Sequence, residues 1–417
     1  MHIRIDENNR SMTRRALATV STLLTALLLV GGPAGARSRP EGPLAGKLAK
    51  ALAVSGINTH LSAALALDLS TGELLFKRRR FFALEPASNE KLPVTYAALQ
   101  VLGGAFRITT NVLGEGGQSG AVWRGNLVLK GAGDPTLSSQ DLKHLAWLVR
   151  ADGIRKVTGA VQGDESFFDS KRGVWGWKSY FYGGESPPLS ALSVDRGVFH
   201  GRLAVRPALA AAALFRTQLI AAGVSVEGHA EQRRAAEAAV PLTHVSSPPL
   251  WKILRFMDQW SDNFTAELVL KQLGAREGHG TSPGGAAVVR RVLSQSNVPL
   301  TGVRIVDGSG LSVRDRLTVG ALVAILQAAW ADPAMRKPFQ SVLAVAGRSG
   351  TMRKRLLSGS TKGRVFAKTG TTNEASALSG YVKGRYAFAI LHNGNPLASW
   401  YAKVAEDRFV TVLAHAP

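Results

Sequence analysis

The sequence contains no cysteine among its 417 residues. Disulfide bonds and thiolate catalysis are therefore excluded, and the folded chain must depend on its apolar core for stability. The nine histidines are scattered, without a His-x-x-x-His or His-Glu-x-x-His spacing. The sequence thus gives no indication of a preformed metal site.

Acidic residues are scarce as well. The 29 Asp and Glu residues stand against 51 Lys and Arg, for a formal net charge of +22. Such an excess attracts polyanions over long distances. No zinc-finger, RNA-recognition or basic-zipper pattern accompanies it, so nucleic acid is not an expected partner. We favour a solvated basic surface, and the anionic polymers of a cell envelope are candidate partners.

The apolar run over residues 16–30 is too short for a comfortable membrane span. It follows Arg14 and Arg15 and precedes the small residues 34–36, which is the order of parts in a cleavable export signal. We therefore expect residues 1–36 to be a signal peptide and the protein to work in the periplasm or cell envelope. If the segment were retained, it would serve as a membrane anchor.

Apolar patterns predict strands at both ends of the remaining chain. Residues Ser62–Asp68 and 73–76 flank a Ser-Thr-Gly turn and predict a hairpin. Between the terminal strands, apolar residues recur at helical spacing in four segments, and a meander is predicted near the C-terminus. The helices are expected at 251–257, 264–273, 285–293 and 318–330, and the last strands at 363–369, Ala375–Val382 and 385–391. Strands at both ends predict one sheet built from both termini.

The stretch 105–242 has a different character, with short strand-like runs, glycine-rich turns and one helical segment at Ser139–Ala151. Strands are predicted at 126–130 and 157–164. We interpret this stretch as a β-rich domain inserted into a catalytic domain that is made of residues 37–104 and 243–417.

Three short motifs could carry chemistry, and the first is Ser88-Asn89-Glu90-Lys91 at the start of a helix predicted over 89–102. Three residues apart on a helix, Ser88 and Lys91 share a face. A buried lysine loses its proton more readily, so a neutral Lys91 could take the serine proton without a histidine. Taken alone, the quartet is better interpreted as a helix-start serine and a surface lysine, because such quartets are common in any chain. Pro93 lies about one turn into this helix, which is tolerable but not ideal.

The second motif, Ser261-Asp262-Asn263, lies between two predicted helices. A second hydroxyl can relay a proton to a leaving amine, and an amide can hold both a lysine and a substrate backbone. Alone, the triplet also fits a plain helix N-cap.

The third motif is Lys368-Thr369-Gly370, followed by Thr371, at the end of a predicted strand. A lysine and a hydroxyl there can bind a carboxylate, and a glycine lets a substrate backbone lie against the strand edge. Alone, the motif fits a strand followed by a turn. Each of the three motifs occurs once, in this order, which is the combination of class A β-lactamases and penicillin-binding proteins.

The motifs and their surroundings resemble the class C low-molecular-mass penicillin-binding proteins, which are D-alanyl-D-alanine carboxypeptidase/endopeptidases. The similarity covers nearly all of the chain after the predicted signal peptide. It is carried by residues 86–92, 127–137, 261–267, 307–312, Gly350–Met352, 368–371 and 378–382.

This resemblance implies an α+β protein with the penicillin-recognising transpeptidase (β-lactamase-like) fold. An antiparallel sheet is flanked by helices, and extra domain material is inserted between the first two motifs. Class A β-lactamases place these two motifs far closer together than Ser88 and Ser261. The insertion is nevertheless shorter than in family members with two inserted domains, so we expect one reduced insertion.

By the same resemblance, Ser88 is the acylated nucleophile, Lys91 its base, Ser261 the relay to the departing D-alanine, and Asn263 the residue that orients Lys91 and substrate. Lys368 and Thr369 would bind the terminal carboxylate, followed by Gly370, and the amides of Ser88 and Thr371 would form the oxyanion hole.

The substrates implied are peptidoglycan stem peptides that end in D-alanyl-D-alanine, with β-lactams as inhibitors and no cofactor. Two other functions stay open at this point. A serine β-lactamase would share the acylation groups but deacylate fast, and a non-catalytic wall-binding protein could keep the same fold.

Overall fold

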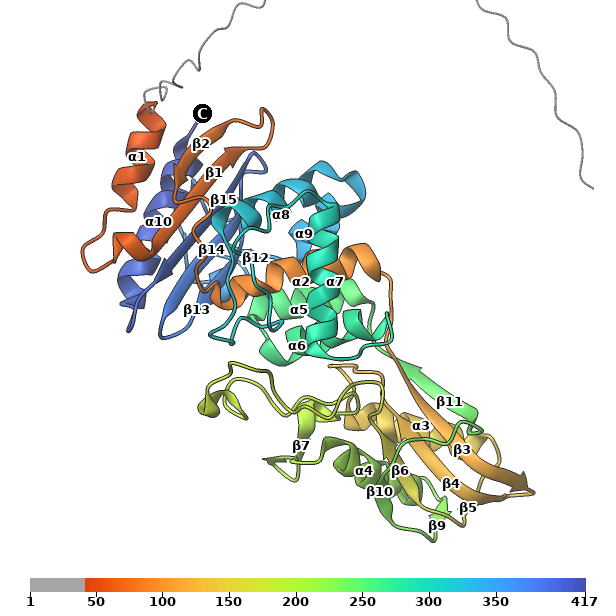
Figure 1. Ribbon diagram of the computed structural model, residues 1–417. Helices are drawn as coiled ribbons and strands as arrows, with labels where there is room; N and C mark the ends of the chain where they lie inside the picture. Colours follow the sequence, from red (N-terminus) through yellow and green to blue (C-terminus); the bar gives the residue numbers. More distant parts are fainter. Residues whose placement is uncertain (1–41) are drawn as a thin grey trace, which may run out of the picture. The chain divides into compact units, whose positions relative to one another are not determined.

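A six-stranded antiparallel sheet joins the two ends of the described chain, which covers residues 42–417 in the computed structural model. The predicted signal peptide lies outside this range. The strand order is β12-β13-β14-β15-β1-β2, so strands from the beginning and the end of the chain lie side by side (Figure 1). The predicted sheet from both termini is confirmed. Its strands are β1 (Ser62–Asp68), β2 (Leu74–Arg78), β12 (Ala344–Val345), β13 (Val365–Thr371), β14 (Ala375–Val382) and β15 (Tyr386–Asn393).

Both faces of this sheet are covered, which explains why its central strands are apolar at almost every position. In β1 all seven residues are buried. Ala63 and Leu65 pack in the cluster that contains helix α8 (Val319–Ala331), whereas Ala64 and Ala66 pack in the cluster that contains helix α10 (Ser399–His415). Successive side chains thus enter two different cores.

Helix α1 (Pro43–Ala51) packs beside α10 on one face of the sheet. The other face carries α8 and a group of helices around α2 (Lys91–Val101). The four predicted helices of this group are present, and α9 joins them with a proline in its interior. Their bounds are α5 (Leu250–Trp260), α6 (Asn263–Ala275), α7 (Ser282–Gln295), α8 as given above, and α9 (Pro333–Val342).

Helices α1, α9 and α10 were not predicted from the sequence. The first two are short and contain proline, which weakens their helical signal. Among the helices of residues 42–417, none has the length and apolar character that crossing a bilayer requires.

A second, mixed sheet is formed by the residues between α2 and α5. Its main order is β10-β6-β4-β3-β11, and β5 pairs with both β4 and β9. The helices α3 (Ser139–Ala151) and α4 (Pro207–Ala221) pack on it. The strands are β3 (Thr109–Ser119), β4 (Val122–Lys130), β5 (Lys156–Val157), β6 (Val161–Asp164), β9 (Ser225–Val226), β10 (Ala230–Gln232) and β11 (Val240–Ser246), with a separate two-stranded ribbon of β7 (Val198–Phe199) and β8 (Arg202–Leu203).

Two predictions for this stretch were wrong in detail. The predicted strand 157–164 is two strands, because the chain turns at Gly159, where a Cβ would lie 2.3 Å from the Asn126 side chain. The prediction of a single helix missed α4, whose alanine-rich sequence favours a helix but shows little amphipathic contrast. The domain limits 105 and 242 stay a prediction, and β11 runs past residue 242 to Ser246.

Removal of the Phe409 ring tests the core between the six-stranded sheet and α10. Phe409 is fully buried and meets Phe76 edge to face, with ring centroids 5.5 Å apart. We expect Phe409→Ala to lower the free energy of unfolding by about 3–5 kcal/mol, because it leaves a cavity that the sheet cannot fill. Urea denaturation followed by circular dichroism measures this. Arg408→Ala, at an exposed position of the same helix, is the control, and an equal midpoint for both variants would contradict the assignment.

Candidate active site

Ser88 lies in a single turn of 3-10 helix, η2 (Ala87–Glu90), directly before α2. The predicted helix start at residue 89 was therefore early by two residues. Residues 87–90 form the 3-10 turn instead, and Ala87 at its start has a φ of 45°, which is not helical. Because α2 begins at Lys91, Pro93 occupies its first turn, where the missing amide hydrogen has no helical partner to lose.

Two glycines allow other chain segments to approach this turn. A Cβ on Gly310 would lie 1.9 Å from the Ala87 carbonyl oxygen, and φ of Gly310 is +81°. A Cβ on Gly370 would lie 3.0 Å from the Ser88 nitrogen. Gly370, which we expected to face a substrate, therefore also brings β13 against the serine turn.

Lys91 is completely buried beneath Ser88. Its Nζ lies 3.0 Å from Ser88 Oγ, 2.8 Å from Asn263 Oδ1 and 2.7 Å from the Ser309 carbonyl oxygen. Burial lowers the pKa of Lys91 from 10.5 to about 8, although the carboxylates of Asp307 and Asp262 oppose this shift. The amine can thus exchange a proton with the Ser88 hydroxyl near neutral pH.

The second motif turns sharply between α5 and α6. Ser261 has a left-handed backbone with φ of 60°, and Asp262 caps α6 by accepting a hydrogen bond of 2.8 Å from Thr265 N. The helix-cap interpretation of this triplet is therefore correct for Asp262. It does not exclude the chemical one, because Asn263 contacts Lys91 and also donates through Nδ2 to the Glu185 carbonyl oxygen at 3.1 Å.

Lys368 and Thr369 lie on β13 beside this turn. Lys368 is fully buried and donates to Ser261 Oγ and to the Thr369 carbonyl oxygen, both at 2.8 Å. Burial first, and then the charge of Lys91, hold the pKa of Lys368 well below its usual value. The Thr369 hydroxyl pairs with the Thr351 hydroxyl at 2.8 Å.

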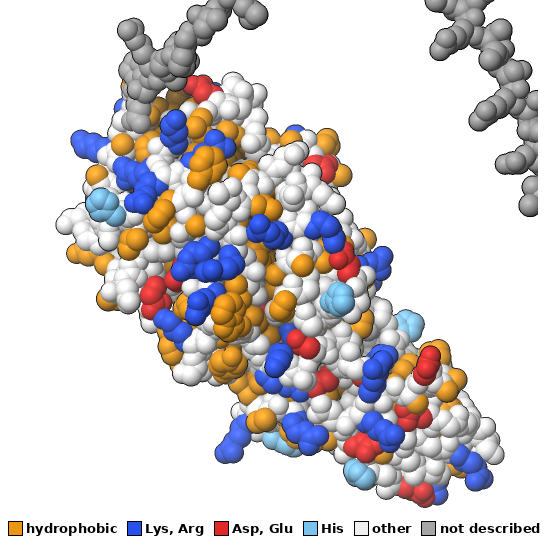
Figure 2. Space-filling model, in the orientation of Figure 1, with side chains coloured by type: hydrophobic (Ala, Val, Ile, Leu, Met, Phe, Trp, Pro, Cys, Tyr) orange, Lys and Arg blue, Asp and Glu red, His pale blue; other side chains and the backbone are white. Residues whose placement is uncertain are grey.

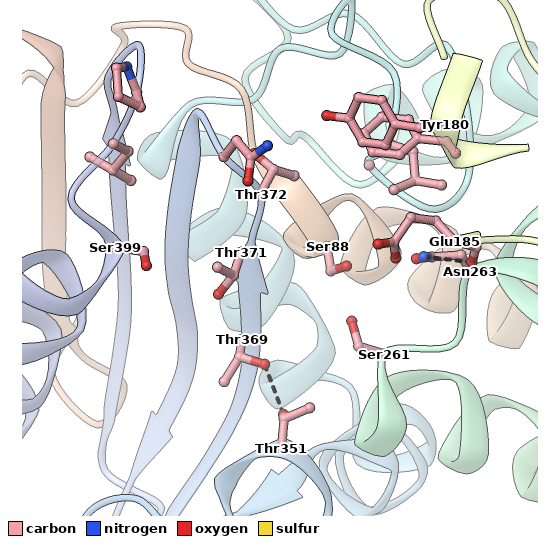
Figure 3. Close-up of a pocket in the computed structure, with 16 residues that line it drawn as sticks. Ser88, Tyr180, Glu185, Ser261, Asn263, Thr351, Thr369, Thr371, Thr372 and Ser399 are labelled. Carbon is pink, nitrogen blue, oxygen red and sulfur yellow. Dashed lines mark hydrogen bonds between the residues drawn. The ribbon is translucent and has the colours of Figure 1, made fainter. Parts of the chain in front are cut away.

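A cavity of about 510 Å³ lies where the three motifs meet, and its lining includes Ser88, Ser261, Asn263, Thr369 and Thr371. In Figure 3 the side chains of Ser88, Ser261 and Asn263 face those of Thr369 and Thr371 across the opening. Lys91, Lys368 and Gly370 lie directly behind this lining. The structure therefore brings all eight residues named from the three motifs to one place, although they come from segments up to 283 positions apart, between Ser88 and Thr371.

Comparison with known proteins agrees with this geometry. A sequence model of the D-Ala-D-Ala carboxypeptidase 3 (S13) family matches residues 44–206 and 201–415. The chain belongs to this family. A D-alanyl-D-alanine carboxypeptidase from Actinomadura sp. (strain R39) is 30% identical over 93% of this chain and 88% of its own length.

The solved structures extend the comparison to the fold. Penicillin-binding protein 4 from Haemophilus influenzae superposes with a TM-score of 0.80 at 20% identity, over 89% of this chain and 99% of that one. Its complex with a β-lactam superposes with a TM-score of 0.74 at 21% identity, over 88% of this chain and 98% of that one. The penicillin-recognising α+β fold and the resemblance to class C low-molecular-mass penicillin-binding proteins are confirmed, and this S13 protein is a serine-type D-Ala-D-Ala peptidase.

Sequence reasoning missed a group of buried carboxyl groups under the S13 site. Asp307 accepts bonds from the amides of Gly310 at 2.7 Å and Ser312 at 2.8 Å, which shape the loop that offers the Ser309 carbonyl to Lys91. Asp307, Glu90 and Glu267 lie in segments that resemble the family, but the resemblance assigned no role to these three residues. The other members are Glu90, Asp258, Glu267 and Asp315, all with raised pKa values that burial causes in the first place.

The stretch between the first two motifs also contributes to the site. Trp177 donates through Nε1 to Asp307 at 2.8 Å, and Tyr180 and Glu185 line the cavity. Lys178 forms an ion pair of 2.5 Å with Glu374, next to β14. Because these contacts lie far apart in sequence, the motifs alone could not have revealed them.

A methyl group at Gly310 should disturb the serine turn. Gly310→Ala would place a Cβ against the Ala87 carbonyl and force a left-handed backbone on alanine. We expect acylation by benzylpenicillin to slow about a hundredfold, since a displacement of about 1 Å in a reacting group has effects of this size. Stopped-flow or quenched mass measurements report the rate. Gly359→Ala, where a Cβ meets nothing within 4 Å, is the control, and equal rates for the two variants would refute this account.

Proposed function

We propose that Ser88 attacks the peptide bond between the two terminal D-alanines of peptidoglycan stem peptides, with Lys91 as its base. The observation that carries this proposal is the buried Lys91 amine, 3.0 Å from Ser88 Oγ. When Lys91 is neutral, its nitrogen lone pair can accept the serine proton while Asn263 and Ser309 hold the amine in place. The Ser88 oxygen then bonds to the carbonyl carbon of the penultimate D-alanine.

The negative charge of the tetrahedral intermediate needs hydrogen-bond donors, and the amides of Ser88 and Thr371 would supply them. The Thr372 amide, directly after β13, donates to the Ala375 carbonyl at the start of β14 at 2.8 Å. Because amide directions alternate along a strand, the Thr371 amide points to the opposite side, toward the open edge of β13. Among the described residues, β12 pairs with β13 only at Phe366 and Ala367, so this edge is free to receive a substrate.

Departure of D-alanine requires a proton on its amine, and Ser261 can deliver it. Lys91 carries the proton that it took from Ser88, and Ser261 can pass this proton to the leaving nitrogen while Lys368 holds Ser261 Oγ at 2.8 Å. Lys368 and the Thr369 hydroxyl would bind the terminal carboxylate, whose charge favours the protonated form of Lys368. Water then hydrolyses the ester on Ser88 and returns the enzyme to its starting state.

The two alternative functions are less well supported. A β-lactamase would need rapid deacylation, and turnover of a chromogenic cephalosporin at many cycles per second would favour it. A non-catalytic wall-binding protein would have no use for the paired Ser88 and Lys91. A Ser88→Ala variant that complements fully in cells would favour that function.

A D-Ala-D-Ala peptidase acts in the cell envelope, where its substrate is found. We infer that the chain is exported by the predicted signal in residues 1–36. Figure 2 shows Lys and Arg side chains spread over the visible face, with acidic side chains fewer among them. This distribution fits the net charge of +22 and supports anionic envelope polymers as additional partners.

Acylation by benzylpenicillin tests the nucleophile. After incubation, the intact mass of the wild-type protein should increase by one penicilloyl group, and Ser88→Ala should show no adduct, because only Ser88 Oγ can form the ester. Peptide mapping locates the modified residue. An adduct on a different residue, or an untouched drug and protein, would rule out Ser88 as the nucleophile, and consumption of the drug without an adduct would identify a β-lactamase.

The pH dependence of acylation tests the base. The pKa of Lys91 is lowered to about 8, so the amine is protonated and inactive as a base below this pH and neutral above it. We expect the acylation rate constant to rise about tenfold per pH unit below about pH 8 and to level off above it. Rates from about pH 6 to about pH 10 give the profile. A rate that stays constant across this range would exclude Lys91 as the base.

A further inference from the structure

A strained loop reaches the active site from the stretch between the first two motifs. Three consecutive residues, Asp195, Arg196 and Gly197, have left-handed φ angles of 47°, 58° and 76°. Glycine adopts this region freely, whereas two adjacent residues with side chains rarely do. Such a conformation persists only where the surroundings enforce it, which makes the loop a candidate for a functional role.

The base of the loop is anchored on both sides. The Asp195 amide donates to the Leu137 carbonyl at 2.9 Å, and the Asp195 carboxylate accepts a bond of 3.0 Å from the Ser139 amide, at the start of α3. The Gly197 amide closes the turn on Val194 at 2.8 Å. These bonds direct the Arg196 side chain to α6.

Arg196 binds Asp262, the central residue of the second motif. Nη1 lies 3.2 Å from Oδ1 and Nη2 lies 2.7 Å from Oδ2, so the guanidinium binds the carboxylate with two parallel hydrogen bonds. The guanidinium carbon also lies 5.1 Å from the centroid of the Phe264 ring. The Asp262 side chain is 15% exposed and the Arg196 side chain is 37% exposed, so solvent screens the ion pair in part.

Asp262 connects the two residues that act in the proposed mechanism. On one side is Ser261, whose φ of 60° needs support, and on the other is Asn263, which holds Lys91. The Asp262 carboxylate also caps α6 through Thr265. A group that fixes this carboxylate therefore fixes both neighbours.

We propose that Arg196 is a positioning residue of the peptidase site, which orients Ser261 and Asn263 through Asp262 and balances the charge of Asp262 near Lys91. The inference deepens the proposed function and rests on it. The stretch between the first two motifs would then be a working part of the catalytic machinery in addition to a wall of the cavity.

The effect of Arg196 on the protonation of Lys91 depends on the charged groups that face Lys91. The carboxylates of Asp307, Asp262, Glu267 and Asp258 favour its charged form, and buried Lys368 is a like charge. Glu90, the preceding residue, is also buried and has a raised pKa. Removal of the positive charge of Arg196 leaves Asp262 unbalanced, which stabilises the ammonium form of Lys91. The base would then become available only at higher pH.

The experiment compares four proteins: wild type, Arg196→Gln, Asp262→Asn and the double variant. For each, the rate constant of penicilloyl-adduct formation is measured by intact mass from about pH 6 to about pH 10. We expect Arg196→Gln to move the midpoint of the profile to higher pH and to lower the plateau by about tenfold to a hundredfold. Asp262→Asn should move the midpoint to lower pH. In the Asp262→Asn background, Arg196→Gln should have little further effect, because the two residues act as a pair.

Two further variants separate charge from geometry and from general effects. Arg196→Lys keeps the charge but loses the paired hydrogen bonds, so it should retain the wild-type midpoint with a lower plateau. Arg206→Gln removes a charge from the same stretch and should match wild type, because the only described hydrogen bond of the Arg206 side chain is to Gln232. A merely structural role of Arg196 would lower stability without moving the midpoint.

The outcomes distinguish this inference from the proposed function. If wild type forms the adduct on Ser88 but Arg196→Gln keeps its midpoint and plateau, the role of Arg196 is refuted while the function stands. Equal effects of Arg196→Gln with and without Asp262 would also refute it. If wild type forms no adduct at Ser88, the function fails and the inference fails with it. Should Arg196→Gln not fold, Arg196→Lys tests the geometric part, because a wild-type plateau would refute it. Asp262→Asn then tests the electrostatic part, because a wild-type midpoint would refute that.

Discussion

The buried amine of Lys91 is the contact on which the rest of the site depends. One nitrogen contacts Ser88, Asn263 and the Ser309 carbonyl, so it joins three segments that are far apart in the chain. An uncompensated buried ammonium is costly, so each of these partners must be in place for the lysine to remain there. The same burial lowers its pKa, which suits Lys91 to the proposed role of base. Both the stability of the site and the proposed chemistry therefore require Lys91 to be buried among these three partners.

The six-stranded sheet, which is covered by helices on both faces, provides the rigid support for the Lys91 contacts. Its strands come from both ends of the chain, and its helices bury both faces, so β13 holds Lys368 and Thr369 at a defined distance from Ser261. The helix side supplies Ser88 and Asn263. A reaction centre between a sheet edge and helix starts can offer backbone amides and side chains together, which an acyl transfer needs.

The stretch between the first two motifs supports the site at several points. Trp177 bonds Asp307, the Glu185 carbonyl holds Asn263, and Arg196 holds Asp262. Each of these contacts acts on a residue behind or beside the reactive groups. The buried carboxyl groups act in the same region, because they are close enough to oppose the effect of burial on Lys91. The electrostatics of this site thus arise from the whole arrangement and cannot be assigned to the motifs alone.

The sequence by itself determined the three motifs, their order, the two-ended sheet and four of the helices around it, because these are local patterns of residue type and periodicity. It also predicted eight residues of the site, five of which are among those that line the cavity. The tertiary structure alone decided which groups surround them. The Ser309 carbonyl, the Thr351 hydroxyl and the Arg196 guanidinium have no local signature, since a hydrogen bond between residues 66 or 218 positions apart depends on the path of the chain. Ser261 and Arg196 likewise adopt left-handed backbones that their residue types do not favour, so only packing could impose them.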